Sequence, residues 1–128
     1  MASKAVLRVG ALLGVTSVAA GAYGSHMLEA HYQADMPGRL DDDDVKRWKS
    51  VYDTGFKMHM FGAASTMALA GCTSVMARPT LAPALLCVGT VVFSGSCYAA
   101  AYKADRNLGA GAPFGGTAMM MGCLAALL

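Results

Sequence analysis

The sequence has few charged residues, and long stretches of it have none. Only 14% of its 128 residues are charged, whereas soluble domains average about 25%. Four stretches contain no Asp, Glu, Lys or Arg: residues 9–28, 58–77, 79–102 and 107–128. A helix needs roughly 20 apolar residues to cross about 30 Å of hydrocarbon. Each stretch is long enough, and a soluble bundle is disfavoured because its helices would need polar faces toward water.

Several kinds of functional site are also missing. The chain has no basic run of the kind that binds nucleic acid. Its cysteines, Cys72, Cys87, Cys97 and Cys123, form no Cys-X-X-Cys pair, so we expect neither a redox dithiol nor a zinc site and interpret them as small buried apolar residues. There is no phosphate-binding loop, no pair of intramembrane carboxylates and no nucleophile–base spacing. We therefore expect no enzyme, and no small-molecule substrate is identified.

The charge-free stretches predict four membrane helices in one domain, residues 1–128. The expected spans are residues 9–25, 58–77, 84–102 and 109–128. Short polar breaks separate the later spans, so successive helices should be antiparallel neighbours. The predicted fold is all-α, a membrane-embedded antiparallel four-helix bundle in the lipid bilayer. Pro113 makes the fourth span short, because only 16 residues run from it to Leu128.

Residues 29–57 form a polar region that holds 12 of the 18 charged side chains. A run of four Asp, residues 41–44, precedes a helical pattern, and carboxylates suit a helix start because they cap free N–H groups. Val45, Trp48, Tyr52 and Phe56 then form an apolar stripe at helical spacing. We interpret this region as an amphipathic interfacial helix between the first two spans, with the stripe as its docking surface. A solvated helix that touches no lipid is the alternative.

The basic residues predict an orientation for the four spans. Both termini would lie on one side of the membrane, together with Lys4, Arg8 and Arg78. The other side would carry seven basic residues, five of them within residues 29–57. Since cytoplasmic and matrix loops are enriched in Lys and Arg, we expect the polar region on that side.

Glycines mark the expected helix-packing positions. Small residues on one helix face let a neighbouring backbone approach closely, as in the Gly-X-X-X-Gly motif of residues 10–14. The expected packing glycines are Gly10, Gly14, Gly21, Gly95, Gly115, Gly116 and Gly122. A Leu at Gly14 or Gly95 is predicted to destabilise the bundle by blocking this approach.

His26 and His59 form a possible polar or ligand pair. His26 ends the first span and His59 opens the second, so a hairpin would place both at one membrane face. Neutral imidazoles can bind zinc, copper or haem iron. A zinc site, however, needs three or four ligands and a second shell, and no cysteine lies near these histidines in sequence. The simpler interpretation is that both satisfy hydrogen bonds near helix ends, so we expect no metal and no cofactor; proton handling is a further alternative.

Four clusters, in this order and spacing, resemble the domain of unknown function 423 / transmembrane protein 256 family of small membrane proteins. The clusters are residues 21–26, Tyr52 with His59, residues 93–98, and Leu108-Gly109 followed by residues 113–116 and Gly122. The resemblance covers nearly the whole chain and implies four membrane helices with an uncharacterised molecular function. The chain departs from the family in having Cys123 where a Trp usually follows the late Gly, and in a longer polar region.

These features favour a structural or accessory integral membrane protein. Its helices carry small-residue faces but no internal chemistry, and its polar region could dock on other membrane-protein subunits. We expect a small subunit of a larger assembly, such as a respiratory complex of the mitochondrial inner membrane, with the bacterial plasma membrane as the alternative location. A small transporter or channel is the alternative function. It would need ionisable groups near the middle of the membrane, and the four spans offer only Ser and Thr there.

Overall fold

The computed structural model describes residues 2–128, and every regular element in that range is helical. In chain order the elements are α1 (Ala2–His26), α2 (Leu28–Asp35), α3 (Asp42–Cys72), α4 (Leu81–Lys103), the 3-10 helix η1 (Arg106–Gly111) and α5 (Ala112–Ala125). The predicted all-α class is confirmed. Neither α2 nor η1 is predicted by the sequence patterns.

The polar region differs most from its prediction. α3 is one continuous helix of 31 residues, where the sequence suggests an interfacial helix and a separate span. Its start is as expected: the Asp41 side chain accepts a hydrogen bond of 2.8 Å from the backbone N–H of Asp44. No proline interrupts the passage from its charged half, residues 42–57, to its apolar half, residues 58–72. The helix therefore continues through the predicted boundary.

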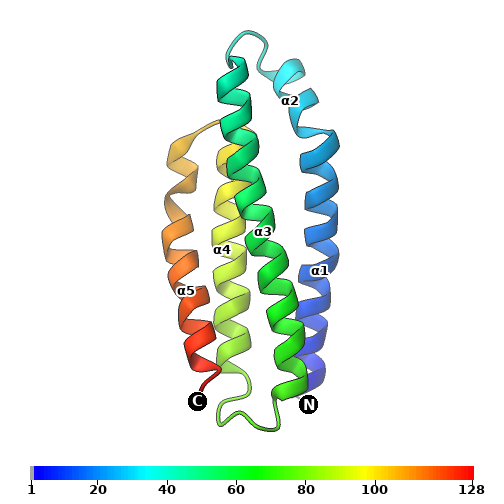
Figure 1. The fold of residues 1–128 in the computed structure, drawn as a ribbon, viewed down its shortest axis with the longest axis vertical. Coiled ribbons are helices and arrows are strands. Elements are labelled where there is room, and N and C mark those ends of the chain that lie inside the picture. The colour runs from blue at the N-terminus through cyan, green and yellow to red at the C-terminus, as the bar shows by residue number, and fades with distance from the viewer. Residues whose placement is uncertain (1) are drawn as a thin grey trace.

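The four long helices lie side by side in an open row, in the order α1, α3, α4, α5 (Figure 1). Consecutive helices of the row run in opposite directions in Figure 1. α1 packs on α3, α3 on α4, and α4 on α5, whereas α1 barely meets α4. The arrangement is thus a row whose two edges are α1 and α5, and not a compact bundle in which the first and last helices meet.

A core of large side chains lies at the charged end of the row. It consists of Leu28, Tyr32, Trp48, Tyr52, Ala100 and Ala101, all buried. The Tyr32 hydroxyl donates a 2.6 Å hydrogen bond to the Ala101 carbonyl, and burial raises the pKa of this phenol to about 12. α2 therefore docks firmly against α3 and α4.

This core changes the role of the predicted apolar stripe. Trp48 and Tyr52 are only 6% and 7% exposed. Both belong to the buried core with residues of α2 and α4, and Tyr52 also lies against Gly24 of α1. Val45 packs at the edge of the same core, and Phe56 is partly buried. The stripe exists at the predicted spacing, but it faces the protein itself, so these side chains offer little surface to lipid or to a partner.

In the apolar half of the row, neighbouring helices approach each other most closely at glycines. A Cβ added to Gly115 would lie 2.7 Å from the Cα of Phe93 and 2.8 Å from the Gly89 carbonyl oxygen. A Cβ on Gly122 would lie 2.9 Å from the backbone nitrogen of Leu86. The backbones of α4 and α5 are in direct contact at these positions, which leaves no room for a side chain.

The predicted packing glycines do not all behave alike. Gly10 is close to α3, because an added Cβ would lie 2.9 Å from the backbone nitrogen of Met67, and Gly21 is close to the Phe56 ring. At Gly14 and Gly116 an added Cβ would make only ordinary contacts of 3.9 and 3.5 Å. Gly95 has nothing within 4 Å of that position, so Gly95 is not a packing glycine in this structure and the predicted destabilisation by Leu there has no structural basis.

Close contacts also occur at glycines that the sequence analysis did not select. At Gly62 an added Cβ would collide with the Thr90 side chain, and at Gly55 it would lie 2.6 Å from the Cβ of Cys97. Cys97 is the one buried cysteine within residues 2–128, whereas Cys72 and Cys123 are exposed and Cys87 is intermediate. The interpretation of all four cysteines as buried residues therefore holds for Cys97 alone.

α1 and α4 are each long and apolar enough to cross a membrane. α3 carries charges along its first half, and α5 has 14 residues, which corresponds to about 21 Å. Even so, large apolar side chains are exposed on every helix of the row, for example Leu12, Phe61, Val91 and Phe114. Apart from Lys4, Arg8 and Arg78, all charged residues belong to residues 29–57 and 103–106, at the end of the row where α2 lies (Figure 1).

Candidate functional site

A polar cluster centred on His59 lies where α1, α3 and α4 meet. The His59 Nε2 atom is 3.2 Å from the Thr16 hydroxyl oxygen on α1. Its Nδ1 atom is 3.1 Å from the Tyr98 hydroxyl on α4. Because His59 is only 8% exposed, these two side chains supply its polar contacts, and one imidazole ring connects three helices.

The hydrogen bonds around His59 favour one tautomer. The Thr16 hydroxyl donates to the backbone carbonyls of Leu12 and Leu13, at 2.9 and 3.0 Å, so its oxygen accepts from the Nε2–H of His59. The unprotonated Nδ1 then accepts from the Tyr98 hydroxyl. A neutral imidazole satisfies every group in this arrangement. Neither ring nitrogen is left free for a metal ion or for a proton from a substrate.

Two further hydrogen bonds tie the same helices together. The Tyr52 hydroxyl of α3 donates to the Ala20 carbonyl of α1 at 2.7 Å. The Ser94 hydroxyl of α4 donates to the Gly55 carbonyl of α3 at 2.8 Å. The rings of Tyr52 and Tyr98 also lie against each other, with centroids 4.7 Å apart. The cluster therefore works as a set of cross-links between helices, each polar group bonded within the protein.

Removal of the Tyr98 hydroxyl should test this structural role. Tyr98→Phe leaves Nδ1 of His59 buried without a donor, so we expect a loss of about 1–3 kcal/mol in stability. The measurement is thermal unfolding of the purified protein in a mild detergent. Tyr102→Phe is the matched control, because the Tyr102 ring is 40% exposed and its hydroxyl makes no hydrogen bond within residues 2–128. Equal stability of the two variants would contradict the cross-linking role.

The two histidines of the predicted pair do not meet. His26 ends α1, ten residues beyond Thr16, which is about 15 Å along the helix axis from the partner of His59. His31 lies closer to α4: its ring stacks on Tyr102 with centroids 4.1 Å apart, and its Nδ1 pairs with Asp35 at 2.6 Å. Within the described residues, no three His, Cys, Asp or Glu side chains are grouped so that they could hold a metal ion.

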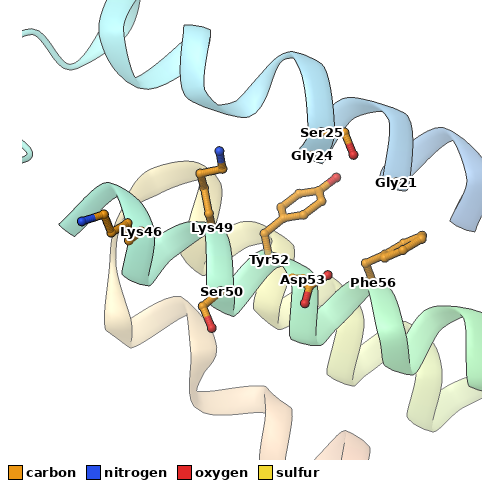
Figure 2. Close-up of a pocket in the computed structure, with 9 residues that line it drawn as sticks. All are labelled: Gly21, Gly24, Ser25, Lys46, Lys49, Ser50, Tyr52, Asp53 and Phe56. Atoms are coloured by element: carbon orange, nitrogen blue, oxygen red, sulfur yellow. The ribbon is translucent and has the colours of Figure 1, made fainter. Parts of the chain in front are cut away.

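A cavity of about 530 Å³ opens between α1 and α3 at the charged end, next to this cluster (Figure 2). Its lining residues are Gly21, Gly24, Ser25, Lys46, Lys49, Ser50, Tyr52, Asp53 and Phe56. The rings of Tyr52 and Phe56 extend toward the glycines of α1 in Figure 2. We call this space the α1–α3 cavity.

The charges of the α1–α3 cavity are largely balanced. Lys49 pairs with Glu29 at 2.7 Å, and Lys46 pairs with Asp43 at 3.3 Å. The Lys49 ammonium group, through its hydrogen bond, lowers the pKa of the Glu29 carboxyl. Asp53 in the cavity wall pairs with Lys57 at 2.7 Å. No strong uncompensated charge therefore attracts an ionic ligand to this cavity.

Comparison with known proteins decides the family. Residues 20–116 match the family model described as "Protein of unknown function (DUF423)". The chain belongs to the DUF423 family. The match includes the whole His59 cluster apart from Thr16.

DUF423 relatives occur in bacteria and in yeast, and their names describe them as membrane proteins. A UPF0382 membrane protein of Staphylococcus haemolyticus is 34% identical over 122 residues, 94% of this chain and 90% of the relative. The UPF0382 membrane protein YwdK of Bacillus subtilis is 31% identical over 92% of this chain and 89% of its own. A UPF0382 membrane protein of Schizosaccharomyces pombe is 32% identical over 91% and 93%. No solved structure matches the chain.

The residues that suggested the DUF423 family come together in the fold. Tyr52 lies against Gly24, and His59 is bonded to Tyr98. Gly115 lies against the backbone of Phe93. The family pattern in this chain therefore consists mainly of interhelical contacts. The chain is a membrane protein of an uncharacterised family, and these contacts hold its helices in place.

Proposed function

We propose that this DUF423 protein is a non-enzymatic accessory protein that spans the membrane four times and binds other membrane subunits. The observation that carries the proposal is the uncovered face of α4, an inner helix of the row. Ala84, Val88, Val91, Gly95 and Ala99 are all exposed and follow each other at spacings of three or four residues. Nothing lies within 4 Å of a Cβ added at Gly95. Such a face of small and β-branched residues accepts another helix at close range.

Four spans are supported by the placement of charge and apolar surface. α1 and α4 have the length and composition of spans. The apolar half of α3 exposes Met60, Phe61 and Met67, and α5 exposes Phe114, Met120 and Leu124. These side chains lie beside the two candidate spans in the row, and water is a poor environment for so much apolar surface.

The state of the polar interior favours an accessory role over transport. A transport path needs polar groups that are open to water or to a substrate. Thr16, His59, Tyr98 and Ser94 are instead bonded to each other or to backbone carbonyls. This supports a proposal in which the interior holds the helices together and the outer faces carry the function.

The proposal extends to the kind of assembly that would contain the protein. A respiratory complex of the mitochondrial inner membrane remains one assembly of the proposed kind. The bacterial relatives favour a role that the bacterial plasma membrane can also host. The relatives' names mention neither a complex nor a transported substrate.

A leucine at the open face of α4 tests the proposal. Gly95→Leu should leave folding intact but obstruct a partner helix, so the protein should lose its co-migrating membrane subunits in native electrophoresis from a mild detergent, read out by mass spectrometry. Gly71→Leu is the matched control, because Gly71 is equally open but lies on α3. Migration of the unaltered protein as a bare monomer or small homo-oligomer would refute the accessory role, and would make transport the leading proposal.

A further inference from the structure

The opposite side of α3 carries a second cavity at the charged end of the row. It has a volume of about 420 Å³ and lies between α3, α4 and η1. Two arginines from distant parts of the sequence, Arg47 of α3 and Arg106 of η1, line it, and Trp48 and Ala100 are among its apolar lining residues. We propose that this arginine cavity binds the phosphate group of an anionic phospholipid.

The two arginines of the arginine cavity have no direct ion-pair partner within residues 2–128. No acidic residue is among its lining residues. Neither Arg47 nor Arg106 forms an ion pair within residues 2–128, whereas Lys46, Lys49 and Lys57 each have a carboxylate partner. Two unpaired guanidinium groups on one concave surface favour an anion over a neutral or cationic ligand.

The chemistry of the two side chains favours phosphate. A guanidinium group presents a planar fork of N–H donors that matches two phosphate oxygens. The Arg47 guanidinium carbon lies 5.3 Å from the centre of the Trp48 ring, a cation–π contact that holds this side chain beside the cavity. Gly109 and Ala110 of η1 complete the lining, so the site is formed by the loop between the last two helices together with α3.

The position of the cavity favours a lipid as the source of the phosphate. It lies at the end of the row that carries most of the charged residues, where lipid headgroups would surround the protein. Beyond this charged end the helices of the row expose apolar side chains, for example Phe61 of α3 and Val91 of α4. Such side chains are available to the acyl chains of a lipid whose phosphate is bound in the cavity. Basic pockets between membrane helices are known sites for anionic headgroups.

The α1–α3 cavity does not offer the same chemistry and therefore serves as a control. It is larger and also contains two cations, Lys46 and Lys49. Both are already paired, and Asp53 lies in its wall. A diffuse attraction to anionic lipid would depend on these lysines as much as on the arginines, whereas a specific site would not.

The test compares lipid binding to the protein and to three variants. Purified protein in a mild detergent is titrated with phosphatidylglycerol or with phosphatidylcholine of the same acyl chains, and bound lipid is counted by native mass spectrometry. Arg47→Gln with Arg106→Gln should weaken phosphatidylglycerol binding about tenfold or more, given the usual contribution of a basic residue near anionic lipid. Lys46→Gln with Lys49→Gln should change it less than about threefold. Arg47→Lys with Arg106→Lys, which keeps the charge, should give an intermediate loss.

Each outcome decides the proposal. Equal binding of the two lipids would overturn it. So would equal losses of phosphatidylglycerol binding in the variant without Arg47 and Arg106 and in the variant without Lys46 and Lys49. A parallel titration with glycerol 3-phosphate separates the sources of phosphate: binding as strong as that of the whole lipid would show a site for a soluble phosphate ester and refute a lipid site. Thermal unfolding of every variant without added lipid confirms that the compared proteins are folded. If the variant with Arg47→Gln and Arg106→Gln is unfolded, the variant with Arg47→Lys and Arg106→Lys alone decides.

Discussion

Gly115→Leu is expected to separate α5 from α4 and to destabilise the protein severely. The added side chain would have to occupy the space of the Phe93 backbone and the Gly89 carbonyl oxygen. Backbone atoms cannot turn aside as a flexible side chain can, so the helices must move apart. We expect a loss of about 3 kcal/mol or more, at or above the upper end of the usual effect of overpacking, measured as thermal unfolding in a mild detergent.

The control for this prediction carries the same substitution on the neighbouring helix. Gly95→Leu on α4 points into open space, so we expect its stability to change by less than about 0.5 kcal/mol. If both variants unfold like the unaltered protein, direct contact between the α4 and α5 backbones is not required for stability. If both are destabilised equally, general intolerance of leucine in these helices explains the result better than a specific contact.

Trp48→Ala is expected to have the second large effect. Trp48 is 6% exposed and belongs to the buried core that also contains Leu28 and Tyr32 of α2, so its removal leaves a cavity in the core on which α2 docks. Loss of a buried Trp typically costs about 3–5 kcal/mol. Faster backbone hydrogen exchange across residues 28–35 should accompany this loss, because α2 is held mainly by this core.

The matched control distinguishes a core residue from a membrane anchor. Phe114 on α5 is 77% exposed, so Phe114→Ala should change stability in detergent by less than about 1 kcal/mol. A Trp48→Ala variant with unchanged stability and unchanged exchange in α2 would restore the interpretation of Trp48 as part of the docking surface of an interfacial helix.

Sequence patterns predicted those structural features that depend only on residues close together in the chain. The charge-free stretches correctly indicated an all-α chain but missed the first half of α3, residues 42–57, and the four-Asp run correctly marked the start of α3, with Asp41 as its cap. The apolar stripe from Val45 to Phe56 was also real. A periodic stripe shows that one face is buried, but it cannot show against what. Here α1, α2 and α4 together supply the cover, and α2, an eight-residue helix with mixed polarity, gives almost no sequence signal.

The glycines show the same limit at the level of single residues. Gly10 and Gly14 belong to one motif, yet only Gly10 lies against the α3 backbone. The difference depends on how α1 is rotated about its axis, which is decided by its contacts with α3. Gly62 and Gly89 are isolated glycines in helices and carry no motif, but both lie at close contacts. Likewise, nothing local to His59 indicates that Thr16 and Tyr98, 43 and 39 residues away, will be its partners.

The 3-10 helix η1 has a consequence for the surrounding lipid. α5 alone contains 14 residues, or about 21 Å, whereas α1 contains 25, or about 37 Å. η1 leads directly into α5, and its rise of about 2 Å per residue adds roughly 12 Å. On the proposal that all four helices of the row span the membrane, η1 brings the α5 edge to about 33 Å. The two edges then differ by only a few ångströms, so the energetic penalty of hydrophobic mismatch at the α5 edge stays small.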